Sequence, residues 1–278
     1  MIKCVCWSAR VFNIFRFIAI VLSMSTVSFA AAAIPTNGGF ETGNLSGWST
    51  IGDANVENPT LGINPPSGHF QAIITTRSNI QMNPELPFSG ANAVNISALE
   101  TFTMGFVSSQ IRFLLELNGY GNISASEGSA IQTTFSASAG ESLSFLYNFL
   151  TAEGGSNDFA FVSVQPVGGF DGPDLLADVL TSTPVLSPTI PIPGGSVPGF
   201  FWNAETGYHQ FSHVFAEDGL YSLTIGVADT GDTEAGSALL IDDVTLQAAS
   251  SIPAPGSLAL LGLGLAGIGC GRRRKQSV

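Results

Sequence analysis

The sequence predicts an all-β protein, a two-sheet β-sandwich of the jelly-roll type, flanked by an N-terminal signal peptide and a short C-terminal transmembrane helix. Short runs rich in β-branched and aromatic residues are separated by Gly, Asn, Asp, Ser and Pro. No long stretch of the middle region keeps the 3.6-residue period of a helix, and several runs alternate apolar with polar residues. Both ends of the 278-residue chain are apolar and basic.

The first 33 residues resemble a secretory signal peptide in composition. A basic beginning is followed by an apolar stretch at residues 17–27 and by small residues at 30–33, where cleavage is expected. The basic residues are Lys3, Arg10 and Arg16. We therefore expect export through the Sec translocon, with an uncleaved N-terminal anchor as the alternative.

Residues 34–251 are expected to form one extracytoplasmic β-sandwich domain. In the run from Tyr221 to Val227, for example, every second side chain is apolar, so that one face of a strand is suited to a core. Nine strands are expected in this region: 69–76, 101–107, 111–117, 130–136, 142–150, 159–164, 207–215, 219–228 and 237–247.

Two segments depart from this strand pattern. Residues 174–180 follow Pro173 and carry four apolar side chains that would share one side of a helix, so a short helix is expected there. Residues 183–198 contain five prolines, and proline cannot donate to a central ladder. This second segment is expected to be an exposed loop or edge connection, or a boundary between two subdomains.

The charge of the middle region differs sharply from that of the ends. Only two basic residues, Arg77 and Arg112, accompany all 21 acidic ones between Glu41 and Asp243, which gives a formal charge of −19. Such a surface disfavours nucleic acid and anionic lipid and favours cations and solubility. The three cysteines all lie in the terminal segments, so a disulfide framework and a thiol nucleophile are excluded from the exported part.

Catalytic constellations are hard to assemble from this composition. His209 and His213 share a face, but no HExxH motif and no third ligand accompany them, which disfavours zinc. The chain has no Gly-x-Ser-x-Gly elbow and no P-loop. The acidic run from Asp229 to Glu234 lacks the rest of the EF-hand pattern and is interpreted as a tight turn. We therefore expect a protein that is not an enzyme.

Aromatic residues after the proline-rich segment offer one candidate ligand contact. Phe200, Phe201 and Trp202 are adjacent, and exposed aromatic rings can stack on sugar rings. Trp202 is therefore a candidate glycan contact. Packing in the core is the favoured interpretation of these rings, because aromatic side chains dominate burial in sandwiches.

Residues 252–278 form a three-part tail. A Pro-Ala-Pro sequence is followed by an uncharged, Leu- and Gly-rich run at 256–271 and by a basic end at 272–275. As a helix, the apolar run would be about 24 Å long, somewhat shorter than the ~30 Å hydrocarbon core of a bilayer. The flanking residues are Pro253, Ala254, Pro255, Arg272, Arg273, Arg274 and Lys275.

This tail resembles the PEP-CTERM sorting signal of Gram-negative bacteria. The resemblance implies recognition and removal by an exosortase-type membrane transpeptidase. It also implies transient membrane anchoring by the C-terminal helix, then release to the cell surface or the extracellular space. Ala254 departs from the family, which usually has a glutamate between the two prolines. A buried C-terminal core helix is the alternative interpretation of the apolar run.

The two ends of the expected domain carry a second resemblance. The segment from Asn37 to Trp48 and the segment from Ala238 to Leu246 are similar to the first and last strands of carbohydrate-binding-module jelly rolls and related bacterial surface domains. In that group an opening acidic residue and a closing aspartate often share a structural Ca²⁺. The resemblance therefore implicates Glu41 and Asp242, with Asp243 less central.

The stretch 128–164 also resembles surface domains that precede PEP-CTERM tails, a resemblance that concerns fold and location. Taken together, these features predict an exported, non-catalytic cell-surface or extracellular-matrix protein associated with exopolysaccharide or biofilm. The alternatives are a carbohydrate-binding lectin-like module and a secreted hydrolase. An ice-binding protein is a remote alternative, because the chain has no regular Thr-x-Thr array.

Overall fold

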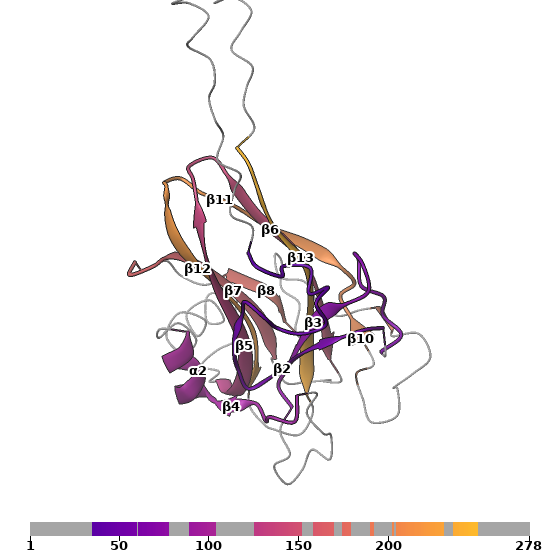
Figure 1. Ribbon diagram of the computed structural model, residues 1–278. Helices are drawn as coiled ribbons and strands as arrows, with labels where there is room; N and C mark the ends of the chain where they lie inside the picture. Colours follow the sequence, from indigo (N-terminus) through magenta and orange to yellow (C-terminus); the bar gives the residue numbers. More distant parts are fainter. Residues whose placement is uncertain are drawn as a thin grey trace, which may run out of the picture. The chain divides into compact units, whose positions relative to one another are not determined.

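Thirteen strands of the described part pair into two antiparallel sheets, and a single α-helix accompanies them (Figure 1). The computed structural model describes residues 35–59, 61–77, 89–103, 125–151, 158–169, 174–178, 190–191, 202, 204–230 and 236–249. All of these residues belong to one unit, residues 32–278. The expected all-β, two-sheet sandwich is therefore confirmed.

The first sheet has six strands, in the order β1-β5-β12-β7-β8, with β4 beside the end of β5. Their bounds are β1 Ser49–Ile51, β4 Val94–Asn95, β5 Ala125–Ala137, β7 Phe159–Pro166, β8 Asp174–Asp178 and β12 Gly219–Thr230. Both faces of the central strand β12 are buried from Tyr221 onward. Its polar face is satisfied in part by cross-strand hydrogen bonds, such as the one from Gln132 Nε2 to Thr224 Oγ1 at 2.8 Å.

The second sheet has seven strands, in the order β2-β3-β13-β6-β10-β9, and β11 also pairs with β6. Their bounds are β2 Asp53–Glu57, β3 Gln71–Thr75, β6 Ser142–Thr151, β9 Ile190–Pro191, β10 Ala204–Glu205, β11 His209–Val214 and β13 Ser237–Gln247. Along one edge of β6, β11 pairs with residues 142–147 and β10 with residues 150–151. The chain thus crosses repeatedly between the two sheets.

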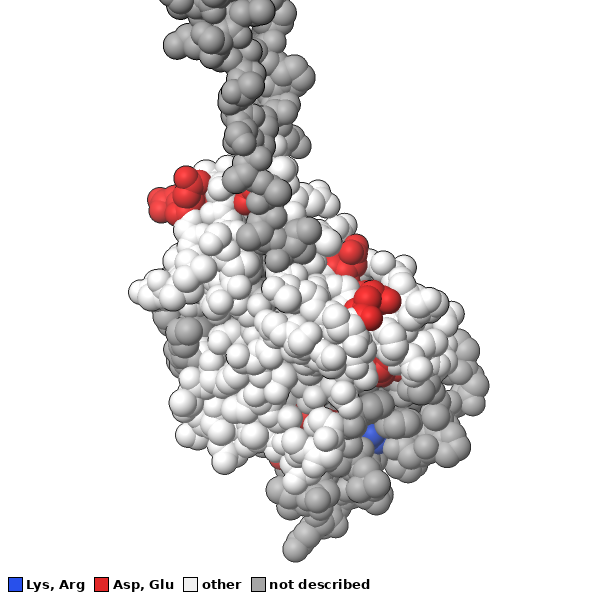
Figure 2. Space-filling view, in the orientation of Figure 1, with Lys and Arg blue, Asp and Glu red and all other residues white. Residues whose placement is uncertain are grey.

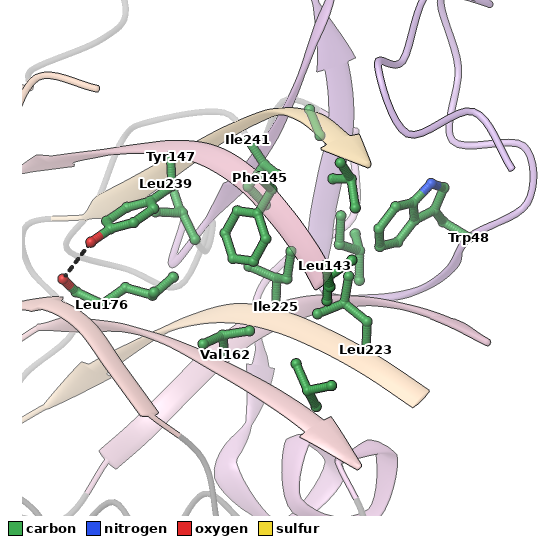
Figure 3. Packing of buried hydrophobic residues seen from close by; sticks show 14 of the residues in the cluster. Trp48, Leu143, Phe145, Tyr147, Val162, Leu176, Leu223, Ile225, Leu239 and Ile241 are labelled. Carbon is green, nitrogen blue, oxygen red and sulfur yellow. Dashed lines mark hydrogen bonds between the residues drawn. The ribbon is translucent and has the colours of Figure 1, made fainter. Parts of the chain in front are cut away.

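The main hydrophobic core lies between the sheets (Figure 3). Alternate residues of each strand contribute to it, as the period of two requires. The predicted apolar face of β12 is confirmed, because Leu223, Ile225 and Val227 are fully buried in this core. At one side of the core the Tyr147 hydroxyl donates to the Leu176 carbonyl at 3.3 Å and so links β6 to β8.

The helix α2, Ile96–Phe102, replaces the beginning of the strand expected at 101–107. The Asn95 side chain caps it by accepting a hydrogen bond from the Ala98 amide at 3.0 Å. Leu99 is fully buried against the outer face of the first sheet, in a cluster with Phe159 and Phe161. The β-branched residues around Thr101 suggested a strand, but the Asn cap and this apolar contact favour a helix.

The helix expected at 174–180 is also wrong, because residues 174–178 form the edge strand β8. This strand pairs with β7 and places Leu176 in the core. The pairing shifts register between Ala160 and Phe161, so an irregularity replaces the strict alternation that marks a strand in sequence. The consecutive Leu175 and Leu176 are therefore compatible with a helix or a strand, and the pairing with β7 favours the strand.

Seven of the nine expected strands coincide with observed ones, and six observed strands were not expected: β1, β2, β4, β8, β9 and β10. The expected strand at 111–117, the proline-rich segment apart from 190–191, the signal peptide and the C-terminal tail lie outside the described residues. Within the described part, no helix has the length and apolar character needed to cross a bilayer.

Candidate functional site

Glu41 holds one end of a loop that precedes β3. Its carboxylate accepts hydrogen bonds from the His69 amide, at 2.9 and 3.1 Å, and from the Phe70 amide at 3.0 Å. These bonds, first that of Phe70 and then that of His69, lower the pKa of Glu41. Gly68 is required beside this carboxylate, because an added Cβ would lie 2.2 Å from Glu41 Oε1 and because its φ is +62°.

Asp242, in β13, holds the other end of the same loop. Its Oδ2 accepts from the Ser67 amide at 2.9 Å and its Oδ1 from the Asp243 amide at 2.7 Å. The side chain is fully buried. Burial raises the pKa of Asp242 to about 6, against the lowering effect of those two bonds, and the negative charges of Asp243 and Glu41 raise it further.

The backbone around these residues is held in uncommon conformations. Phe40 and Asp243 have φ values of 55° and 53°, which non-glycine residues rarely adopt. β13 shifts register between Asp242 and Thr245, and at this irregularity the Val244 amide donates to the Gly38 carbonyl at 3.0 Å. The opening turn of the domain is thereby attached to its last strand, next to the loop that both carboxylates hold.

Two of the three expected calcium ligands therefore contact the same loop. Asp242 binds the Ser67 amide and Glu41 binds the amides of His69 and Phe70, whereas Asp243 is exposed on the irregularity. Ca²⁺ takes six to eight oxygen ligands and accepts backbone carbonyls and water beside carboxylates. Two carboxylates are suitable ligands for such an ion. One of them, that of Asp242, is buried, and no basic side chain of the described part faces it. Among described residues, no three acidic, His or Cys side chains converge as a ready metal site.

A buried polar cluster, the outer polar cluster, lies beside Asp242 on the outer face of the second sheet. Its members are Glu57, Gln71, Asn148, Glu205, Thr206 and Tyr208. The Tyr208 hydroxyl donates to Gln71, whose amide donates to Glu57. Burial first, and then the charges of Glu57, Asp242 and Glu205, raise the pKa of Tyr208.

The other half of the outer polar cluster joins β6 to β10. The Asn148 amide donates to Glu205, and the Thr206 hydroxyl donates to the Asn148 side-chain oxygen at 3.3 Å. The Phe149 amide donates to the Thr206 hydroxyl at 3.0 Å. Because these carboxylates are committed to internal hydrogen bonds, the arrangement is suited to holding strands and loops together.

Sequence reasoning missed this cluster. The only signal is the placement of Gln71 and Asn148 in largely apolar strands, where polar residues commonly face solvent. Glu57 gives no such signal, because its strand also carries Asp53 and Asn55. The structure shows that loops cover this face. Leu61, Ile63 and Trp202 form a third apolar cluster there with Ile73 and Leu240, separate from the main core and from the cluster around Leu99.

Trp202 is only 2% exposed. Its indole Nε1 donates to the Gly236 carbonyl at 2.7 Å, and the Arg77 guanidinium carbon lies 5.0 Å from the centre of its ring. The ring is therefore packed inside the protein, as in the core-packing interpretation, and has no exposed face on which a sugar could stack. Phe200 and Phe201 lie outside the described residues.

The histidines do not come together. His69 is exposed in the loop before β3, whereas His209 and His213 lie on the half-buried face of β11. His209 faces the Tyr147 ring at 6.3 Å between centroids, and His213 faces Phe215 at 5.0 Å. Both β11 histidines are thus part of an aromatic row.

The acidic run interpreted as a turn begins inside β12, which extends to Thr230. Asp229 pairs across the sheet with Glu127, and both are buried. Burial raises the pKa of Glu127 to about 7. Residues 231–235, which include Asp232 and Glu234, lie outside the described residues. On the face of the molecule in Figure 2, the visible acidic side chains form separate spots among uncharged residues.

Comparison with known proteins identifies the tail. Residues 251–275 match the PEP-CTERM protein-sorting motif, and the expected resemblance is confirmed there. The motif implies export and sorting to the cell surface, with processing by an exosortase. No curated protein sequence matches the chain significantly.

Among solved structures, the chain resembles carbohydrate-binding modules and adhesin domains. The module TmCBM61, solved with β-1,4-galactotriose, matches with a TM-score of 0.39 and 13% identity, covering 78% of this chain and 98% of that one. The K1 cleaved adhesin domain of Lys-gingipain from Porphyromonas gingivalis matches with 0.37 and 12%, covering 76% and 95%. The xylan-binding CBM22-1 domain of Paenibacillus barcinonensis Xyn10C matches with 0.34 and 13%, covering 80% and 97%. These likenesses are too distant to carry an argument about function.

Replacing Trp202 with Ala should destabilise the domain by about 3–5 kcal/mol, because a large buried ring and its hydrogen bond are lost. Chemical denaturation measures this free energy of unfolding. Exchange of exposed Val214 for Ala is the control and should change it by less than about 0.5 kcal/mol. If the Trp202 variant kept the stability of the wild type but no longer bound glycans, the buried structural role would be wrong and Trp202 would be a sugar-stacking residue.

The stability of the domain should fall as the pH rises from 5 to 7.5. Glu127 and Asp242 have folded-state pKa values of about 7 and about 6, above their ordinary values of 4.5 and 3.8. The folded state therefore keeps protons that the unfolded state has released, and Glu127 alone contributes on the order of 2 kcal/mol across this window. Urea unfolding at a series of pH values measures the slope.

Glu127→Gln should flatten that pH dependence, because its side chain no longer titrates. Val214→Ala serves as the control, because Val214 is exposed, does not titrate and is not among the groups that shift the pKa of Glu127 or Asp242. The slope of this variant should equal that of the wild type. Equal slopes in the wild type and in Glu127→Gln would contradict the assignment.

Proposed function

We propose that this protein is an exported, non-catalytic surface or extracellular-matrix protein. In this proposal the Sec translocon exports the chain, the apolar run at 256–271 anchors it transiently, and an exosortase-type enzyme releases it to the surface. The observation that carries the proposal is the match of residues 251–275 to the PEP-CTERM sorting motif. The acid-rich middle region, with a formal charge of −19, suits a soluble protein in that location.

We extend the proposal to association with exopolysaccharide, which is the material that such a protein meets at the surface. The buried position of Trp202 argues against a role for that ring in stacking on sugar. Weak association through the polar surface of the sandwich therefore fits better than a deep lectin site. A glycan array separates the two, because a lectin-like module would retain a defined set of glycans strongly.

We also propose that one structural Ca²⁺ joins the opening turn to β13 at Glu41 and Asp242. Support comes from the loop at Ser67 to Phe70, which both carboxylates hold. Further support comes from the burial of Asp242 and from the mutual repulsion of the two charges. A divalent cation would offset that repulsion, and backbone carbonyls and water would complete its shell.

Removal of calcium should lower the melting temperature of the wild-type protein by several degrees. An ion present at a hundred times its dissociation constant stabilises the folded state by about 2.7 kcal/mol. Asp242→Asn should abolish most of the difference between calcium and chelator, whereas the exposed-residue control Glu217→Gln should keep it. A wild-type melting temperature that is equal in calcium and in chelator would rule the ion out.

Intact mass and cell fractionation test the sorting route. We expect a mature species that has lost Arg272 to Lys275 and is found outside the inner membrane. Replacing Arg272, Arg273, Arg274 and Lys275 with Gln should leave the chain unprocessed and move full-length chain out of the membrane fraction, because the basic end no longer stops transfer. Full-length chain in the inner membrane of wild-type cells would make the tail a permanent anchor instead.

A further inference from the structure

The strand β11 forms an edge of the second sheet. It pairs with β6 along one side, from the His209–Tyr147 pair to the Val214–Ser142 pair, and no described strand pairs with its other side. An edge presents unpaired amide and carbonyl groups that favour pairing with another strand. Natural edges are commonly protected by lysine, proline or bulges. β11 has no Lys or Pro, and its pairing with β6 shows no register shift.

The sequence of β11 is chemically palindromic about Phe211. It reads His-Gln-Phe-Ser-His from residue 209 to residue 213. His209, Phe211 and His213 are half-buried on one face, and Gln210 and Ser212 are exposed on the other. The Phe211 ring stacks on Phe145 with centroids 5.0 Å apart.

Local charge does not oppose the approach of a second copy to β11. The eleven residues 206–216 contain no Asp or Glu, although the region 34–251 carries a formal charge of −19. Two copies of an acidic protein repel each other, and the repulsion is weakest where acidic side chains are absent. β11 is therefore a place at which a second copy can approach closely.

We propose that β11 pairs antiparallel with β11 of a second copy, about a two-fold axis at Phe211. A residue of an antiparallel pair must face the same side as the residue opposite it. The Phe211-centred register meets this condition. It places Phe211 opposite Phe211, each His209 opposite His213, and each Gln210 opposite Ser212. The two second sheets then continue into one another, and the aromatic row along β6 and β11 is extended across the interface.

Charge substitutions on the exposed face test both the pairing and its register. In the full chain in detergent, Gln210→Asp with Ser212→Asp places like charges opposite each other twice. The dimer dissociation constant should rise about tenfold in sedimentation experiments. Gln210→Asp with Ser212→Lys is the matched control, which places opposite charges together and should restore dimerisation. Association through the apolar tail would be insensitive to both double variants.

Cysteine cross-linking gives a second readout. After Cys4, Cys6 and Cys270 are replaced with Ser, the chain has no other thiol. Phe211→Cys should then form a disulfide-linked dimer under mild oxidation, because the two side chains face each other across the axis, whereas Val214→Cys should not. A monomer at all concentrations, or a dimer unaffected by the charge pairs, would overturn the proposal. Cross-linking by Ser212→Cys in place of Phe211→Cys would overturn the register.

Discussion

The antiparallel pairing of β13 with β3 on one side and β6 on the other is the interaction on which the sandwich depends. These pairs join residues near positions 75, 150 and 240, so the second sheet closes only when the last strand is in place. The irregularity in β13 also receives the opening turn through the bond between Val244 and Gly38. β3 and β6 are therefore joined into one sheet only when the C-terminal end of the domain is in place, a topology typical of slowly folding β proteins.

Buried polar groups around β13 are compatible with stability because they are hydrogen-bonded. Asp242 accepts hydrogen bonds from two backbone amides. In the outer polar cluster, hydrogen bonds connect Tyr208 to Gln71 and Gln71 to Glu57. An unsatisfied group in these positions would cost about 1–3 kcal/mol. These directional hydrogen bonds fix the positions of the loops that cover the outer face of the second sheet. Apolar contacts alone are not directional and would fix these loops less well.

Alternation and turn residues were sufficient to predict the regular strands. The apolar face from Tyr221 to Val227 was visible in sequence because each second side chain enters one core. Sequence reasoning failed where pairing overrides local preference, as in β8, and where a cap and one buried leucine decide, as in α2. Glu41 and Asp242 were found through a resemblance, whereas the outer polar cluster depends on which strands are neighbours, and that information is absent from any single segment.

The end of β13 also sets a distance. Regular pairing stops at Gln247, and Pro253 begins the Pro-Ala-Pro sequence of the tail six residues later. Six residues of fully extended chain reach at most about 21 Å, which is less than the diameter of a small domain, about 30 Å. An enzyme that processes the tail must therefore bind its site close to the folded sandwich. The distance between the active site of that enzyme and the membrane surface will determine which side of the sandwich lies against the enzyme.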